Sequence, residues 1–341
     1  MPLAEETSLL SSAPLDDIEL RAVNPHRASP RVAIGDGSLG QEEYVETSRG
    51  SVCIAWQGDR RRPAVVTYHD LGLNYVSSFQ GFMNYMDMKI MAESFSFVHI
   101  NAPGQEPGAP TLPEGFVYPS CDELAEQVRE VIEKLELKRC VGLGIGAGGN
   151  VLTRLCLAHP ELMECLCLVN AVSTPPGWIE WGYQKMNVRH LRNSGMTQGV
   201  MDYLMWHHFG RLEEASHDLA HLYRTQFQAA NSANLSLFIE SYNQRTDLGI
   251  QRPAPAGKQE GVSLRVPVLL ICGNRSPYVD ETVTFNSRLD PANSQWMKIH
   301  DCSLPLEEQV AKVCEAFRLF LQGQGFVPGI GRRMSVEGAA H

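Results

Sequence analysis

The chain has 341 residues, of which 43% are hydrophobic and 20% are charged, and its formal net charge at pH 7 is −10. This composition is typical of a globular protein with a large buried core and excludes a chain that is disordered throughout. The acidic balance, with no basic run longer than Arg60-Arg61-Arg62, disfavours nucleic acid as a partner.

Cysteine usage and the start of the chain bear on the compartment. The nine cysteines are an odd number and show no zinc-type spacing, so reduced thiols buried in a core are expected. The first residues are acidic where a signal peptide needs basic ones. No apolar run reaches the roughly 18 residues that span a bilayer. We therefore expect a cytoplasmic protein without a transmembrane segment, whose contact with membranes would be peripheral.

Strand and helix patterns alternate along most of the chain. Residues 1–40 are rich in Ser, Pro, Gly and acidic residues, which predicts a flexible N-terminal arm. Eight strand-like runs then predict strands. These runs cover residues 43–46, 51–57, 64–68, 95–100, 139–143, 165–169, 266–272 and 295–300. Their alternation with helical patterns predicts a mostly parallel sheet covered on both faces.

The helical patterns divide the chain further. Periodicity is clearest at 122–135, where Ser120 and Glu123 supply a capping box, and at 306–321. Between Asn170 and Arg265 the strand rhythm stops, which predicts a helical cap over the carboxyl edge of the sheet. The expected organisation is a core of residues 41–175 and 251–323, a cap of residues 176–250, and a flexible tail of residues 324–341.

One turn points to a specific fold. The strand at 139–143 runs into Gly144-Ile145-Gly146-Ala147-Gly148 and then into a helical pattern. This is the context of the nucleophile elbow, G-x-S-x-G, of α/β-hydrolases. The predicted fold class is therefore an α/β-hydrolase fold, with an eight-stranded, mostly parallel sheet flanked by helices and a helical cap insertion. Gly146 stands at the nucleophile position, where it has no side chain to form a covalent intermediate.

The other two triad positions also lack the expected residues. Ser276 stands where the acid is expected after the cap, although Asp280 follows four residues later. Ser303 stands where the histidine turn is expected, and His300 falls on the last predicted strand. Because triad members act as a unit, this joint absence predicts a protein that is not an enzyme and has no catalytic residues. A relocated catalytic site is the alternative.

A glycine pattern at the same turn suggests a cofactor that we do not expect. Gly144, Gly146 and Gly149 satisfy G-x-G-x-x-G, the dinucleotide fingerprint. The next strand, however, ends without an acidic residue to hold a ribose. No cofactor is predicted, although a glycine-lined helix start could hold an anion.

Several stretches resemble the N-myc downstream-regulated (NDRG) family. They read TYHDLGLN at 67–74, APGQ at 102–105, GLGIGAGG at 142–149, GWIEW at 177–181, YNQRTDL at 242–248 and FLQGQGF at 320–326. The resemblance implies a cytoplasmic α/β-hydrolase-like protein without hydrolase activity. It also implies protein partners and a link to differentiation, stress response and growth control. The tail is shorter than the Ser/Thr-rich or repeated tails of some relatives.

Two groups of side chains are candidates for a site. His69 and Asp70 follow the third strand, where active hydrolases place an oxyanion-hole loop, and with Gly146 and Ala147 they outline a possible vestigial pocket. Hydrogen bonds that order the loop are the favoured role of His69 and Asp70. In the tail, Ser335 follows two arginines and resembles a phosphorylation site of a basophilic kinase.

The cap is rich in histidines and aromatic residues. His217 and His221 are spaced i, i+4 near Glu213 and Glu214, which suits a metal, but no third ligand is specified and no metal is predicted. The remaining candidates are the histidines His207 and His208, and the larger side chains Trp178, Trp181, Tyr183, Met201, Tyr203, Met205 and Trp206. The larger side chains could form a pocket or a docking surface, but packing between cap and core is the favoured role.

Three functions remain open from the sequence. The first is a binding scaffold that docks protein partners, the second is a receptor for a small molecule or lipid headgroup in the crevice, and the third is a hydrolase with a relocated site. The missing triad favours the first two, because each needs only a surface or a pocket.

Overall fold

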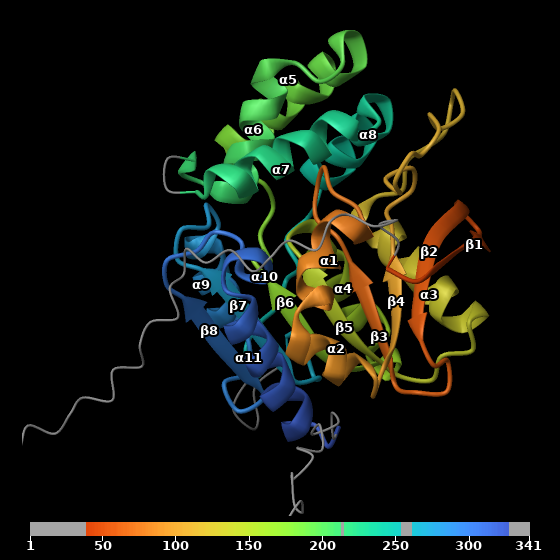
Figure 1. Ribbon diagram of the computed structural model, residues 1–341, viewed down its shortest axis with the longest axis vertical. Helices are drawn as coiled ribbons and strands as arrows, with labels where there is room; N and C mark the ends of the chain where they lie inside the picture. The colour runs from red at the N-terminus through yellow and green to blue at the C-terminus, as the bar shows by residue number, and fades with distance from the viewer. Residues whose placement is uncertain (1–38, 213–214, 254–260, 327–341) are drawn as a thin grey trace, which may run out of the picture. The chain divides into compact units, whose positions relative to one another are not determined.

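The computed structural model describes residues 39–212, 215–253 and 261–326 (Figure 1). One sheet of eight strands has the order β1-β2-β4-β3-β5-β6-β7-β8. The strands are β1 (Gln41–Thr47), β2 (Gly50–Gly58), β3 (Ala64–Tyr68), β4 (Ser96–Ile100), β5 (Cys140–Ile145), β6 (Met163–Val169), β7 (Val268–Gly273) and β8 (Ser294–Ile299). β2 pairs antiparallel with β1 and β4, and the remaining neighbours pair in parallel. The predicted α/β-hydrolase fold is confirmed.

Helices cover both faces of this sheet. α1 (Tyr75–Asn84), α2 (Met86–Ala92), α10 (Pro305–Glu308) and α11 (Val310–Gly323) pack on one face. α3 (Cys121–Lys134), α4 (Ala147–Ala158) and α9 (Val279–Arg288) pack on the other. The neighbours Val65 and Val66 of β3 belong to the two different apolar clusters, because successive side chains of a strand point to opposite faces. This double covering explains why all of β3 is buried.

Side-chain capping boxes start the helices α1 and α3. Ser120 and Glu123 form the predicted capping box of α3, which is confirmed. Asn74 and Ser77 form a second capping box at α1, which the sequence analysis did not identify. This second box fixes the end of the loop between β3 and α1, and that loop carries His69 and Asp70.

A helical insertion lies between β6 and β7, while the short helix η1 (Pro160–Leu162) precedes β6. It contains α5 (Trp178–Ser194), α6 (Gln198–Phe209), α7 (His217–Ala229) and α8 (Ser232–Asn243). Figure 1 shows these four helices beyond the carboxyl ends of the parallel strands. A hydrogen bond from Ser303 Oγ to the Phe209 carbonyl, 2.8 Å long, joins α6 to the core.

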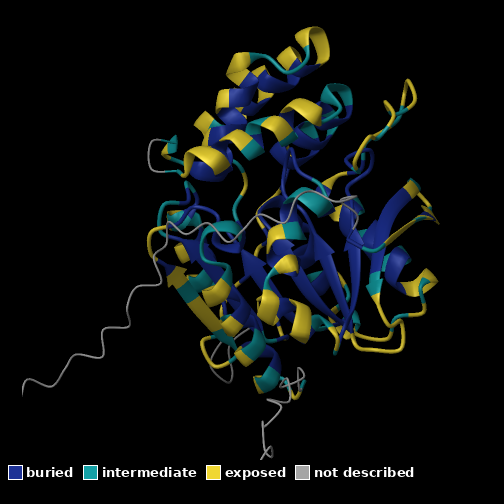
Figure 2. Cartoon of the chain, in the orientation of Figure 1, coloured by how far each residue is buried: buried dark blue, intermediate teal, exposed yellow. Residues whose placement is uncertain are grey.

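The large side chains of the cap divide into two sets, and the packing role predicted for them is wrong for one set. Met201, Tyr203 and Met205 are buried in α6, as expected. Trp178, Trp181, Tyr183 and Trp206 are instead exposed, with Trp178 at 89%. Figure 2 shows the exposed residues along α5 on the outer side of the cap. The rings of α5 project outward because the inner face of that helix is filled by residues such as Val188 and Leu191, and Trp206 is exposed on α6.

The remaining expectations meet the structure only in part. All nine cysteines are free and buried. No helix in the described part of the chain has both the length and the apolar character that a membrane span requires. Most of the predicted N-terminal arm and tail, Ser335, and the pair Glu213 and Glu214 lie outside the described residues.

Candidate functional site

The nucleophile elbow is present without a nucleophile. β5 ends at Ile145, Gly146 forms the turn with φ +49° and ψ −114°, and α4 begins at Ala147. Residues with side chains rarely adopt such a positive φ, so the turn suits glycine. A Cβ atom built on Gly146 would lie 2.2 Å from Cγ of Asp70. The space above the elbow is therefore filled by the carboxyl group of Asp70.

Asp70 occupies the place that an active hydrolase keeps for its substrate. Its Oδ1 accepts hydrogen bonds from the backbone N–H groups of Ala147 and Leu71, each 2.8 Å long. In active α/β-hydrolases the oxyanion hole consists of the N–H after the nucleophile and an N–H from the loop after β3. Ala147 and Leu71 hold these two positions. The carboxylate of Asp70 thus stands where a reaction oxyanion would bind.

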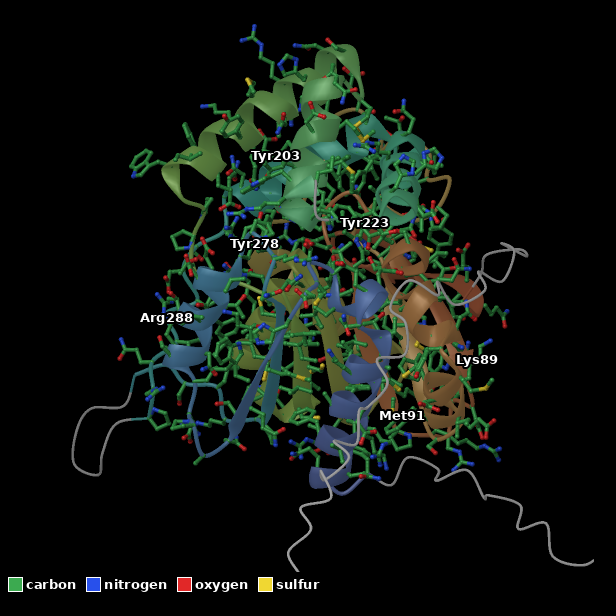
Figure 3. The ribbon with its side chains drawn as sticks, turned by 60° about the vertical axis from the view of Figure 1, so that its left-hand side comes forward. Lys89, Met91, Tyr203, Tyr223, Tyr278 and Arg288 are labelled. Carbon is green, nitrogen blue, oxygen red and sulfur yellow. The ribbon has the colours of Figure 1, made fainter. Side chains whose placement is uncertain are left out.

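Two cap histidines complete the surroundings of this carboxylate. Nε2 of His207 lies 3.1 Å from Oδ2 of Asp70, and Nδ1 of His208 lies 3.8 Å from the same oxygen. His208 Nε2 donates to the carbonyl of Leu71 (2.9 Å), and the hydroxyl of Tyr278 hydrogen-bonds to Nδ1 of His207 (2.6 Å). All of these side chains are buried. Figure 3 shows Tyr278 at the level where the cap meets the core.

Burial and charge act in opposite directions on this cluster. Burial alone would raise the pKa of Asp70, but the neighbouring His207, which also hydrogen-bonds to it, and the hydrogen bond from the Ala147 N–H hold that pKa well below its usual range. Burial lowers the pKa of His208 to about 4, against the opposing charge of Asp70. At neutral pH, Asp70 is therefore ionised and the His208 ring is neutral.

His69 orders the loop and does not face the elbow. Its Nε2 accepts a hydrogen bond from the backbone N–H of Ala102 (2.9 Å), so the proton sits on Nδ1, which donates to the carbonyl of Asp70 (2.8 Å). Burial lowers its pKa to about 4. Of the predicted pocket residues, the structure brings Asp70, Gly146 and Ala147 into contact. His69 does not join them, and instead holds the loop through its hydrogen bonds to Ala102 and the Asp70 carbonyl.

The remaining triad positions hold side chains that serve the fold. Ser276 is buried, and its Oγ accepts from the N–H of Tyr278 (3.2 Å). Ser303 is also buried, and its hydroxyl donates the hydrogen bond to the Phe209 carbonyl of the cap. Asp280 is exposed in the first turn of α9. His300, predicted on a strand, is wrongly placed, because β8 ends at Ile299 and His300 lies exposed in the following turn.

No local pattern in the sequence identifies the roles of His207, His208 and Tyr278. The i, i+4 histidines His217 and His221, which have the spacing of metal ligands, are exposed on α7. His207 and Asp70 are 137 residues apart in the chain, so no local spacing could link them. The only available signal was the general one that a cap covers the carboxyl edge of the sheet.

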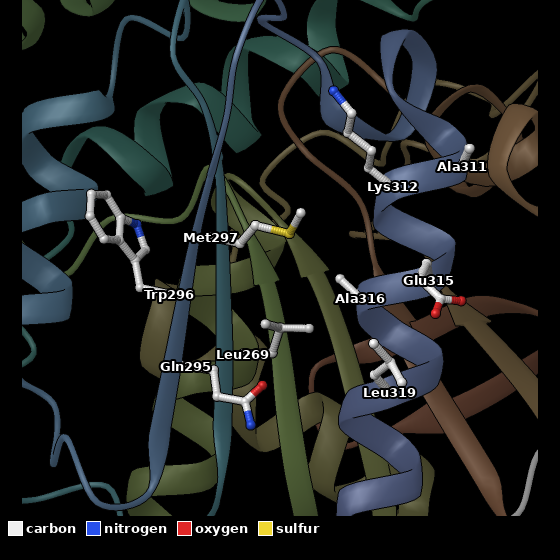
Figure 4. Close-up of a pocket in the computed structure, with 9 residues that line it drawn as sticks. All are labelled: Leu269, Gln295, Trp296, Met297, Ala311, Lys312, Glu315, Ala316 and Leu319. Atoms are coloured by element: carbon white, nitrogen blue, oxygen red, sulfur yellow. The ribbon is translucent and has the colours of Figure 1, made fainter. Parts of the chain in front are cut away.

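An open groove lies elsewhere, between β8 and α11. It has a volume of about 520 Å³. Figure 4 shows Leu269 and Met297 on its sheet side, with Ala316 and Leu319 opposite them on α11. None of its lining residues belongs to the cluster around Asp70, so this groove is separate from the elbow.

The comparisons with known proteins agree with this geometry. Among solved structures, the chain is similar to a thermophilic esterase from Thermogutta terrifontis, with a TM-score of 0.67, 16% identity, and coverage of 84% of this chain and 99% of that one. It is also similar to the enol-lactonase from Burkholderia xenovorans, with a TM-score of 0.65, 16% identity, and coverage of 82% and 100%. At these identities the likeness shows the fold alone.

Relatives in sequence are much closer. The chain is 42% identical to Protein NDRG1 from Xenopus tropicalis, over 84% of this chain and 72% of that protein. It is 37% identical to Protein NDRG2 from Homo sapiens, over 84% and 76%. The model of the Ndr family matches residues 42–328. The resemblance predicted from the sequence is confirmed, and the chain belongs to the Ndr family.

Proposed function

We propose that this protein is a non-catalytic scaffold that docks protein partners in the cytoplasm, within signalling that governs differentiation, stress response and growth. The observation that carries the non-catalytic part is the Asp70 carboxylate bound to the N–H groups of Ala147 and Leu71. An oxyanion cannot enter a hole that already holds a buried anion, and stabilisation of the oxyanion is a major part of acyl-transfer catalysis. Gly146 provides no nucleophile beside it.

The outer face of the cap supports the binding part of the proposal. Trp178 and Ile179 are 89% and 77% exposed, and Tyr183 lies near them on α5 at 56%. Exposed clusters of large apolar side chains mark interaction surfaces, and Trp and Tyr are enriched in binding hot spots. The receptor alternative is disfavoured at the elbow, because the side chains of Asp70 and His207 fill the crevice there. The buried, free thiols fit a reducing compartment.

The non-catalytic part is tested by labelling with a fluorophosphonate probe and by turnover of a p-nitrophenyl ester, on the wild type and on His69→Ala. We expect no labelled serine and no turnover above the buffer rate in either protein. Stoichiometric labelling of one serine, or turnover that His69→Ala abolishes, would overturn this part and point to a relocated site.

The binding part is tested by comparing the proteins that co-purify with the wild type and with Trp178→Ser/Ile179→Ser. The matched control is Val117→Ser, which removes an apolar side chain that is 79% exposed on a loop of the core. We expect the cap variant to lose its specific partners and the control to keep them. Equal partner sets from all three proteins would show that the face of α5 is not the docking surface.

A further inference from the structure

The cluster at the base of the cap has the composition of a metal site. Asp70, His207 and His208 each direct one potential ligand atom inward, and these three atoms lie within 4.8 Å of one another. All three residues are buried. They come from two separate parts of the fold, since Asp70 lies in the loop after β3 and the histidines end helix α6.

The distances match a tetrahedral ion. Metal–ligand bonds of about 2.0–2.2 Å place neighbouring ligand atoms of a tetrahedron about 3.4 Å apart. The two distances from Asp70 Oδ2 are 3.1 Å to His207 Nε2 and 3.8 Å to His208 Nδ1, which lie on either side of this value. All three ligand atoms lie within 4.8 Å of one another, so side-chain rotations could bring them to bonding distance around one ion.

Each ligand is already oriented by a second hydrogen bond. Ligating histidines usually donate their other ring N–H to a carbonyl or a similar acceptor, and ligating carboxylates are held by hydrogen bonds. Here His208 Nε2 donates to the Leu71 carbonyl, which leaves Nδ1 facing Asp70. Oδ1 of Asp70 is held by two backbone N–H groups, which leaves Oδ2 as the ligand atom. Nδ1 of His207 meets the hydroxyl of Tyr278.

The hydrogen bonds also leave lone pairs for a metal ion. A metal ligand needs a free lone pair, and because Nε2 of His208 donates to the Leu71 carbonyl, the lone pair of its ring lies on Nδ1. His207 can turn its Nε2 lone pair to an ion by carrying its proton on Nδ1, where the oxygen of Tyr278 accepts it.

We propose that Asp70, His207 and His208 bind one zinc ion, which fastens helix α6 of the cap to the loop after β3. Imidazole nitrogens with one carboxylate suit zinc, and three protein ligands leave one position for water. Because the ligands come from the core and from the cap, the ion would hold these two parts together. The inference does not depend on the scaffold proposal, and metal content can be measured apart from esterase activity.

The first test measures bound metal. The full chain is produced in zinc-supplemented medium, passed through a desalting column and analysed by plasma mass spectrometry, together with His207→Gln and His208→Gln. We expect close to one zinc per wild-type chain and a loss of about tenfold or more in each variant. The matched control, His217→Gln/His221→Gln, removes the exposed histidine pair of α7 and should keep its zinc. Wild type without zinc, or variants with as much zinc as wild type, would overturn the proposal.

A second measurement separates ligation from misfolding. Cobalt replaces zinc in the medium, and its visible absorption reports four-coordinate geometry with nitrogen and oxygen ligands. Tyr278→Phe keeps every ligand and removes only the hydroxyl behind His207, so it should retain the cobalt spectrum but bind the metal about 10–100-fold more weakly. A cobalt spectrum with sulfur-to-metal bands would place the ion on a cysteine and would also overturn the proposal.

Discussion

At the scale of single residues, Gly146 and Asp70 exclude any larger group from the elbow. The carboxyl group of Asp70 lies where a side chain at position 146 would begin, and it is held there by Ala147 and Leu71. Restoring a serine at the elbow therefore cannot by itself restore a hydrolase. The new side chain would meet a fixed, buried anion.

We expect Gly146→Ser to destabilise the protein by about 2–4 kcal/mol. Overpacking costs about 1–3 kcal/mol, and the positive φ adds about 1 kcal/mol more for a residue with a Cβ atom. Urea unfolding followed by circular dichroism measures the change. The control is Gly182→Ser on α5, where a Cβ atom meets nothing within 4 Å, and its effect should stay within about 0.5 kcal/mol.

The same clash predicts coupling between the two positions. In Asp70→Gly/Gly146→Ser the carboxyl group is gone, so the serine should cost about 1–3 kcal/mol less than it does beside Asp70. The coupling energy follows from unfolding both single variants and the double variant. Strict additivity would mean that the backbone of the elbow, and not Asp70, excludes the side chain.

The elbow of this site could be predicted from the sequence, but the contacts of the cap histidines could not. A strand, a glycine-rich turn and a helix identify the elbow, because this motif is local. The sequence could not show that His207 and His208 of α6 contact Asp70, because this contact depends on how the cap packs on the sheet. The loop after β3 was placed correctly near the elbow, but the direction of the Asp70 side chain is a property of the folded backbone.

At the scale of elements, a buried ion pair fastens the two ends of the cap. Arg245 follows α8 and makes two parallel hydrogen bonds, each 2.9 Å long, to the carboxylate of Glu180 in the first turn of α5. The Arg245 side chain is 2% exposed and that of Glu180 is 13% exposed. Removing one partner leaves the other charge buried and alone.

We expect Arg245→Met to lower the free energy of unfolding by about 3–5 kcal/mol, as for other broken buried pairs. Arg318→Met is the matched control, because Arg318 pairs with Glu315 on the surface of α11 and should change stability by less than about 1 kcal/mol. Thermal unfolding of both variants measures the difference. Similar effects at the two sites would argue that Arg245 contributes packing alone.

The positions of the strands and helices in the chain were largely predictable, but which of their side chains face solvent was not. The central strands such as β3, β4, β5 and β7 appear as short apolar runs, because a strand buried on both faces needs apolar residues throughout. The edge strands β1 and β8 are mostly exposed and mix polar with apolar residues. The cap aromatics were assigned to packing, yet α5 turns Trp178 and Tyr183 outward. Composition shows that large apolar side chains are present in a helix, but their direction depends on which face the neighbouring helices cover.

At the scale of the whole molecule, a buried histidine ties stability to pH. His99 lies in β4, fully buried beside Thr67, Gln57 and three aromatic rings, none of which carries a charge at neutral pH. Burial lowers its pKa to about 3. In the unfolded chain the same ring takes up a proton below about pH 6.5. The unfolded state therefore binds the extra proton first, and stability falls as the pH drops below 6.5.

We expect the difference in unfolding free energy between wild type and His99→Gln to shrink by about 2 kcal/mol from pH 7 to pH 5, at roughly 1.4 kcal/mol per pH unit below 6.5. Urea unfolding of both proteins at several pH values gives this difference, in which the titration of all other groups cancels. Parallel curves for the two proteins would contradict it.

The buried thiols make the folded protein unreactive toward thiol reagents, and unfolding exposes them to reaction. Thiol reagents attack the thiolate, and burial raises the pKa of Cys140 and Cys156 to about 12. Eight of the nine cysteines lie in strands and helices from β2 to α11, and Cys302 lies in the segment after β8. Pulse alkylation followed by peptide mapping would therefore record which parts of the sheet unfold first. The native cysteines serve as the probes, so none has to be engineered.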